Sequence, residues 1–142
     1  MTSDFFDLLA SCHLRFVGTP LGGPHATAHW LYEDAPFGVL AHDAADDPRF
    51  TYANLTAQRC FGYDWAEFIG LPSRLSAEPD RQEDRQHLLD AVHRGGFATG
   101  YRGQRIAKSG RRFWIEDVTM WNLVDGNRLV GQAASFQHWR DA

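Results

Sequence analysis

The chain is poor in cysteine, and it lacks long hydrophobic runs. Cys12 and Cys60 are the two cysteines among 142 residues, and they have neither zinc-ligand nor CxxC spacing. We therefore expect reduced thiols and a cytoplasmic protein, because a domain of this size can bury a sufficient core without a disulfide or a metal. No segment has the pattern of a signal peptide or a membrane span, so we expect neither secretion nor a membrane partner.

Positive charge is also scarce. The chain has 14 Lys and Arg against 18 Asp and Glu, which gives a net charge of -4. No broad positive field is available to attract phosphate backbones, so we expect no nucleic acid as a partner. The one basic stretch, residues 102–112, is interleaved with aromatic residues and is more typical of the solvated face of a hairpin.

Signatures of catalysis and of metal binding are missing too. No GxSxG or Cys/His nucleophile pattern is present, and the glycine-rich segment 18–23 lacks the Lys and Ser/Thr of a phosphate loop. His25 and His29 have i, i+4 spacing, but Ala26 stands where a metalloprotease helix needs Glu. We predict no catalytic residue and no metal site.

The first 24 residues form a unit of their own. Between Asp4 and Val17 the apolar residues recur at helical spacing, with Ser3 as the expected N-cap. The Gly- and Pro-rich segment 18–24 then interrupts the pattern. We therefore divide the chain into residues 1–24, an amphipathic helix with its linker, and residues 25–142, the main domain.

The main domain alternates between short helices and β-prone runs. Asn54 is an expected N-cap, Gly62 an expected helix end, and Asp64 with Glu67 a capping box. Turn signals at 108–110 and 125–127 separate long strands near the end of the chain. The pattern predicts helices at 27–33, 55–61 and 80–94, and strands at 37–43, 49–53, 97–107, 111–124 and 128–139.

The strand around residues 113–123 has apolar residues on both predicted faces. Strict alternation would place Phe113, Ile115, Asp117, Thr119 and Trp121 on one face. An antiparallel sheet with one wet face would alternate more cleanly, so each face must be covered. We expect the N-terminal helix over one face and the short helices over the other.

Local motifs point to a known fold. Phe50-Thr-Tyr-Ala-Asn54, the segment 61–70 and the hairpin Lys108-Ser-Gly-Arg-Arg-Phe-Trp114 resemble PAS-domain motifs. The segments 62–79 and 114–121 are similar, more narrowly, to stand-alone bacterial MEKHLA-domain proteins, a PAS-like family. The resemblance covers about residues 27–139 and implies an α+β fold with a five-stranded antiparallel sheet.

PAS domains bind small molecules, flavin or haem between sheet and helices, or mediate protein contacts. The segment 70–79 resembles a flavin-binding light-sensor motif, in which Ser73 stands in place of the photoreactive Cys. Pro72 and Ile115 stand in place of two flavin-contacting Asn residues. A serine hydroxyl cannot form the flavin–sulfur adduct. His87 and His93, candidates for a haem ligand, lie about 240° apart on their helix, so we expect neither flavin nor haem.

An inward-facing Asp117 is the most informative candidate for a ligand site. A buried carboxylate must be paired, and Tyr52, His42 and Arg59 are candidate partners, or it must orient a ligand. Asn54 is either a helix cap or a ligand contact. The residues expected to line a ligand site are Tyr52, Asn54, Arg59, Ser73, Ile115, Asp117 and Thr119.

The resemblance leaves function open between sensing a small ligand and docking a protein partner. We expect a non-enzymatic module without an effector domain, in which ligand-dependent repacking reaches a separate protein through the N-terminal helix. A homodimer is expected, with contacts through Phe5, Leu8, Leu9 and Phe16. The alternatives are a purely structural dimerisation module with a filled core, and a cone-shaped α+β enzyme whose long helices come first.

Overall fold

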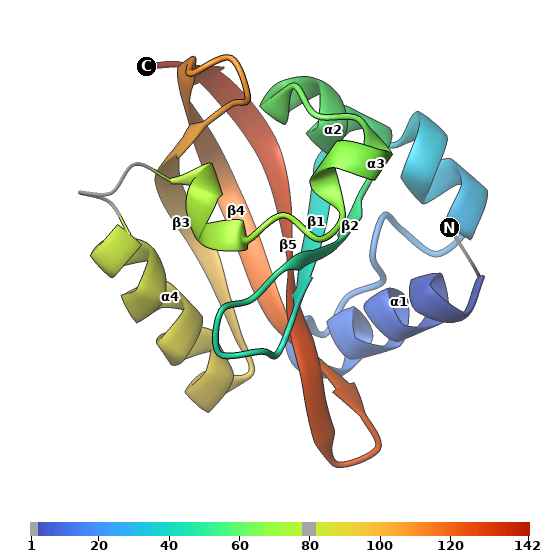
Figure 1. Cartoon of the computed structure of the whole chain (residues 1–142). Helices are drawn as coiled ribbons and strands as arrows, with labels where there is room; N and C mark the ends of the chain where they lie inside the picture. Colours follow the sequence, from blue (N-terminus) through green and yellow to red (C-terminus); the bar gives the residue numbers. More distant parts are fainter. Residues whose placement is uncertain (1–2, 78–81) are drawn as a thin grey trace.

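Five strands form one antiparallel sheet in the computed structural model, which describes residues 3–77 and 82–142 (Figure 1). The strand order is β2-β1-β5-β4-β3. This confirms the predicted five-stranded antiparallel α+β fold. The strands are β1 (Gly38–Asp43), β2 (Phe50–Ala53), β3 (Phe97–Ile106), β4 (Arg112–Asp125) and β5 (Arg128–Asp141), and the helices are α1 (Ser3–Val17), η1 (Trp30–Asp34), α2 (Leu55–Phe61), α3 (Trp65–Phe68), η2 (Ser73–Ser76) and α4 (Gln82–Gly95).

Helix ends follow the capping signals of the sequence. The Asn54 side chain accepts a hydrogen bond from the Ala57 backbone N–H, and Gly62 ends α2 in a left-handed conformation with φ 78°. Asp64 and Glu67 form both hydrogen bonds of a capping box at the start of α3. Short-range chemistry therefore determines where these helices begin and end.

Three helical predictions need adjustment. Ser3 lies inside α1 rather than before it as a cap. The expected irregular segment 71–79 contains the short helix η2, and its last two residues lie outside the described residues. The predicted start of the long helix at Asp80 also lies outside them, and the described helix α4 ends at Gly95. No helix in the described ranges is long and apolar enough to cross a membrane.

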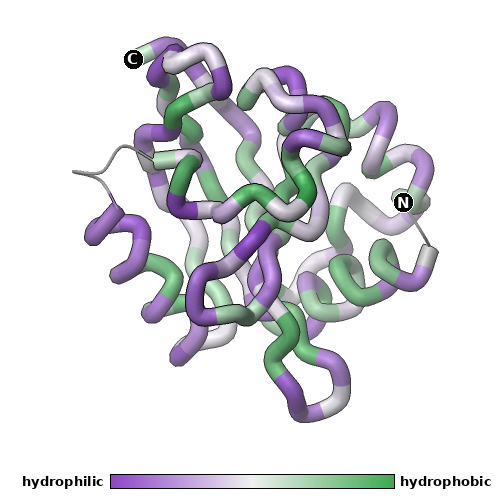
Figure 2. The backbone as a smooth tube through the Cα atoms, in the orientation of Figure 1, coloured by the Kyte–Doolittle hydropathy of each residue, from purple (hydrophilic) through white to green (hydrophobic). Residues whose placement is uncertain are grey.

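Helix α1 covers one face of the sheet, called the helix face here. Leu9 and Cys12 pack there against Trp121 and Leu123 of β4. Trp121 Nε1 donates a hydrogen bond to the carbonyl of Leu9 at 3.2 Å, and the His13 ring stands edge-on to the Trp121 ring at 4.7 Å. Figure 2 shows α1 as largely hydrophobic, as expected for a helix with one buried side.

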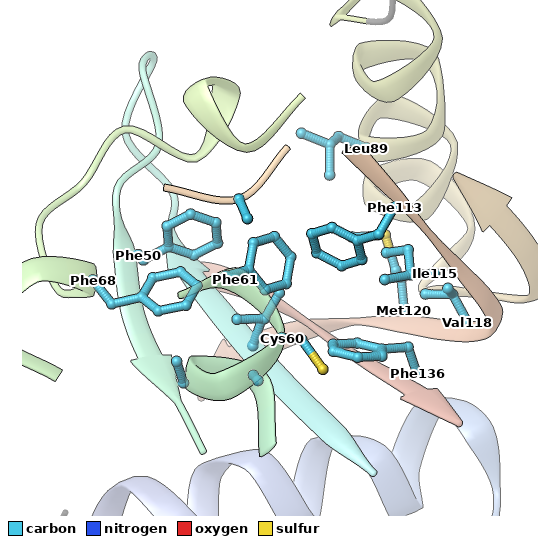
Figure 3. Close-up of a cluster of buried hydrophobic side chains, with 14 of the residues drawn as sticks. Phe50, Cys60, Phe61, Phe68, Leu89, Phe113, Ile115, Val118, Met120 and Phe136 are labelled. Atoms are coloured by element: carbon cyan, nitrogen blue, oxygen red, sulfur yellow. The ribbon is translucent and has the colours of Figure 1, made fainter. Parts of the chain in front are cut away.

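The opposite face, called the cavity face here, is covered by α2, η2 and α4. Its core is an aromatic cluster in which Phe61 contacts Phe68, Phe113 and Phe136 with ring centroids 5.0–6.3 Å apart (Figure 3). Leu89 and Val92 anchor α4 to this face, although Figure 2 shows that α4 is mostly hydrophilic. The predicted coverage of both faces is thus confirmed.

Two irregular pairings change which face a side chain reaches. Between β1 and β2, Ala41 pairs with Tyr52 and His42 pairs with Phe50, so Thr51 is an extra residue. Between β3 and β4, Tyr101 pairs with Val118 and Gly103 with Ile115, so Glu116 and Asp117 both lie opposite Arg102. Asp117 has φ 53°, the left-handed conformation found at β-bulges.

Candidate functional site

A small cavity lies on the cavity face between the sheet, η2 and α4. Its volume is about 50 Å³. The sheet side of its wall is mostly apolar, with Leu40, Ile115, Val118 and Met120. Polar side chains also line the cavity, with His42, Arg105 and Gln132 from the strands and Ser73, Ser76 and Arg85 from η2 and α4. Buried polar groups are therefore concentrated at this one place in an aromatic and aliphatic core.

Arg85 enters the cavity from the first half of α4. Its side chain is 6% exposed, and its Nη2 atom donates a hydrogen bond to the Ser73 hydroxyl. Burial, together with the nearby charge of Arg105, lowers the pKa of Arg85 to about 10. The guanidinium therefore still carries its charge at neutral pH.

Arg105 and His42 complete the polar wall. Arg105, 8% exposed, donates to the carbonyl of Gln104 at 2.9 Å. His42 Nδ1 lies 2.8 Å from the carbonyl of Asp43, so this nitrogen carries the proton, while Nε2 is buried and has no hydrogen-bond partner in the part of the chain that the structure describes. Burial, reinforced by the charge of Arg85, lowers the pKa of His42. Neutral His42 thus offers a lone pair at Nε2.

A pair of buried amides joins α4 to the sheet beside the cavity. Gln132 Nε2 donates to the carbonyl of Leu89 at 3.0 Å and to Asn122 Oδ1 at 3.1 Å. Asn122 Nδ2 donates to the carbonyl of His93 at 3.2 Å. These bonds hold one side of α4, so a displacement of the helix by a ligand would act directly on β4 and β5.

Two of the seven predicted ligand residues line the cavity. Ser73 is 1% exposed and contacts Arg85, and Ile115 is 3% exposed on the apolar wall. Their placement agrees with the expected site, and their role in binding stays a prediction.

Tyr52 was expected at the site but lies on the helix face. The extra residue Thr51 directs Phe50 to the cavity face and Tyr52 to the other, where its ring contacts Phe5, Tyr32 and Trp65. Its hydroxyl is buried without a hydrogen-bond partner, and burial raises its pKa. The placement of Tyr52 at the cavity is therefore wrong.

The prediction that Asp117 and Thr119 share the inner face of Ile115 is also wrong. The bulge at Glu116 and Asp117 shifts the alternation, so Val118 and Met120 continue the wall that Ile115 begins. Asp117 is exposed and Thr119 is half-buried, and neither lines the cavity. No internal partner for an inward carboxylate is needed, because the carboxylate is at the surface.

Asn54 and Arg59 lie away from the cavity. The four hydrogen bonds of the Asn54 amide all involve backbone groups, those of Leu31, Phe37, Val39 and Ala57. This confirms the capping alternative for Asn54. Arg59 is exposed on α2 and lines a separate surface hollow with Arg111 and Trp139.

Sequence reasoning missed Arg85 and Arg105 and named His42 only as a partner for Asp117. A signal existed for Arg85, because it stands at i, i+4 and i, i+7 from Leu89 and Val92 and so shares their apolar stripe. Arg105 has no comparable signal. It lies in the basic stretch that the sequence indicated as solvated.

The predicted contact residues of α1 face their own sheet. Leu9 is 0% exposed and packs internally, so it has no surface to offer a partner. Phe5, Leu8 and Phe16 are partly buried against the same cluster. Contacts of these three residues with a second chain stay a prediction.

The surface histidines lie apart from the site. His25 and His29 both precede η1, with His29 as its N-cap residue, and His29 Nε2 lies 3.4 Å from a carboxylate oxygen of Glu33. His87 and His93 are exposed on α4, and neither lines the cavity.

Flavin and haem do not fit the cavity. Its volume of about 50 Å³ is far below the roughly 300–1,000 Å³ of pockets that hold ligands of drug size. Cys12 lies on the buried side of α1 and Cys60 belongs to the core of the cavity face, and neither cysteine lines the cavity. Burial raises the pKa of Cys60 to about 11, which keeps its thiol protonated.

Comparison with known proteins identifies relatives of this arrangement. The family model described as the MEKHLA domain matches residues 3–141. A PAS domain from Colwellia psychrerythraea has 21% identity and a TM-score of 0.66, over 80% of this chain and 92% of that one. A LOV protein from Rhodobacter sphaeroides has 12% identity and a TM-score of 0.65, over 96% and 67% of the two chains. These similarities show the PAS fold, and no curated protein matches the sequence.

Proposed function

The chain belongs to the MEKHLA domain family and has the PAS fold, and from this premise we propose that it is a sensory module that responds to a small molecule. The observation that carries the proposal is the cavity beneath α4, whose largely apolar wall contains several buried polar side chains. Buried polar groups are normally hydrogen-bonded or paired. Two buried arginines and an imidazole nitrogen without a partner among the described residues line this cavity, and they support a binding function for it.

Strand β4 connects the cavity to α1. Met120 lines the cavity and Asn122 holds α4, while Trp121 between them donates a hydrogen bond to the carbonyl of Leu9 in α1. Further along β4, the Val124 backbone N–H lies 3.3 Å from the Cys12 sulfur. A ligand that favours another packing of α4 would therefore shift a strand to which α1 is hydrogen-bonded.

In this proposal α1 transmits the change to a partner protein or a second copy, in the cytoplasm, and the chain catalyses no reaction. The side of α1 away from the sheet presents Leu14, which is 55% exposed, and Ala10. The strand order and the similarity to a PAS domain differ from the cone-shaped α+β fold that the sequence left as an alternative, so we do not propose that alternative.

Hydrogen exchange of the full chain tests the connection through β4. Asn122→Ala removes the hydrogen bond to α4, and we expect faster amide exchange in α1 relative to α2, which lies on the cavity face and serves as an internal reference. Glu116→Gln is the matched control, since this β4 residue makes surface ion pairs with Arg102 and Arg140. Unchanged exchange in α1 of Asn122→Ala would contradict the proposal.

A structural dimerisation module is the second candidate. The observation that favours it is the small cavity volume of about 50 Å³, which side chains nearly fill. Native mass spectrometry separates the two functions. A non-covalent small-molecule adduct on the purified chain supports sensing, whereas an adduct-free dimer supports the structural function.

A further inference from the structure

Several surface arginines form ion pairs, whereas within the described ranges the two arginines at the cavity do not. Arg74 and Arg111 are partly exposed and lie 3.1 Å and 2.6 Å from the carboxylates of Asp47 and Asp141. Arg85 and Arg105 are at least 92% buried, yet within the described ranges neither has a carboxylate at ion-pair distance. A buried charge is normally paired, because leaving water is costly for an ion. Among the described residues, the cavity is therefore short of negative charge.

Nearby acidic residues do not supply that charge. Asp47 influences Arg85 through space, but its half-exposed carboxylate is held by Arg74. Asp43 turns its Oδ1 to the backbone N–H groups of Ala45 and Arg49. The Ser73 hydroxyl, which accepts from Arg85, is neutral. Two like charges thus face one small space, and each disfavours the other there.

The shape and the lining residues of the cavity favour a carboxylate over an anion such as phosphate. A guanidinium presents a planar fork of donors that matches the two oxygens of a carboxylate. The opposite wall, with Ile115, Val118 and Met120, has no donor side chain. An ion charged on every side, such as phosphate, would leave oxygens against that wall, whereas a short hydrocarbon group would pack on it. The volume of about 50 Å³ admits only a few heavy atoms.

We propose that this cavity binds a small monocarboxylate anion, whose carboxylate is held by Arg85 and Arg105. Its short apolar group packs on the Ile115 side, and the lone pair of His42 Nε2 accepts a hydrogen bond from a hydroxyl or a water bound with it. The assignment names the ligand class of the sensory function proposed above and rests on it.

Calorimetric titration and thermal unfolding of the full chain test this site with propionate as the probe. Sodium chloride at equal ionic strength is the salt control, propionamide is the uncharged analogue, and inorganic phosphate is the competing anion. We expect one propionate per chain, a Kd of about 10 mM or tighter, and a rise in Tm that chloride, propionamide and phosphate do not produce.

Two variants separate recognition from stability. Arg85→Met should weaken propionate binding at least tenfold, while its Tm without ligand equals or exceeds that of the wild type, because an unpaired buried charge is gone. Arg94→Met removes the same charge from an exposed position of α4 and should bind as the wild type does.

Several results would overturn the assignment. These are equal binding of propionamide, binding of phosphate without propionate, a propionate Kd far weaker than about 10 mM, or wild-type affinity in Arg85→Met. Failure of the sensory proposal looks different. Propionate would bind through Arg85, but hydrogen exchange in α1 would not change on binding.

Discussion

Aromatic side chains are buried on both faces of the sheet, but the two faces differ in the polar groups that they bury. On the helix face, Trp121, Tyr52 and Leu9 pack without exposure, and the polar edge of Trp121 has a backbone partner. On the cavity face, the aromatic cluster stops short of α4, and Arg85 and Arg105 line the remaining space. The helix face is closely packed around these residues, whereas the cavity face contains a cavity at the place where its two arginines are buried.

The two faces also differ in how α1 and α4 are attached to the sheet. Helix α1 is held by an apolar stripe and hydrogen bonds from Trp121 and Val124. Helix α4 is anchored by Leu89 and Val92 and by the amides of Asn122 and Gln132, and most of its surface is hydrophilic. We infer that α4 is the more readily displaced of the two helices.

The largest expected effect is on the helix face. Trp121→Ala removes a fully buried ring and its hydrogen bond to Leu9, so we expect a loss of about 3–5 kcal/mol in the free energy of unfolding. Urea denaturation followed by circular dichroism measures it. A loss under about 1 kcal/mol would show that α1 is not docked as described, and Trp139→Ala, at a 40% exposed position, is the control.

On the cavity face, overpacking tests how closely the aromatic cluster is packed. A Cβ atom at Gly38 would come within 2.1 Å of the Phe136 ring, so Gly38→Ala should cost about 1–3 kcal/mol. Gly95→Ala is the matched control, because its Cβ meets nothing within 4 Å, and it should be neutral or stabilising. Equal urea midpoints for both variants would show that Phe136 yields without cost.

Acid should weaken both faces through their buried histidines. Burial lowers the pKa of His42 on the cavity face and of His13 on the buried side of α1, each from 6.5. The unfolded chain then binds more protons below pH 6.5, so stability present above that pH is lost as the pH falls through the lower folded-state values. Urea midpoints between pH 7.5 and 5 should fall less in His42→Gln than in the wild type. The control His87→Gln should retain the wild-type slope, and an unchanged slope in His42→Gln would refute the cavity contribution.

The smallest expected effect concerns Asp117, which lies in the β4 bulge where the alternation of side chains between the two faces reverses. Asp117 has φ 53° in the bulge, a conformation that glycine adopts without a side-chain penalty. Asp117→Gly should therefore keep the bulge and change stability little, with a gain of up to about 1 kcal/mol. Asp117→Val should destabilise the protein, because a β-branched residue is strained there. If Asp117→Val proved the more stable variant by thermal unfolding, the bulge would not be a fixed feature of the strand.

Much of this architecture was predictable from local patterns. Capping residues such as Asn54 and Asp64 act over a few residues, and turn signals near Gly110 and Gly126 separate the long strands, so helices and strands could be placed along the chain. Ser73 and Ile115 were correctly expected near the space between helices and sheet. The cavity itself was not predictable, because its two arginines lie 20 residues apart in the chain, on a helix and a strand, and carry no shared motif.

The sequence by itself determined the five strands and their order along the chain, the need to cover both faces of the sheet, and the family. The tertiary structure decided which side chains meet in the cavity. Strand alternation has a period of two, so the extra residue at Thr51 and the bulge at Asp117 each reverse which face the neighbouring side chains of the strand reach. Both irregularities lie between consecutive strands, and the register of each pairing, which local sequence patterns do not give, decides where the extra residue falls. For that reason Tyr52 and Asp117 do not lie at the cavity, where the sequence placed them. The observed cavity is lined instead by Arg85 and Arg105.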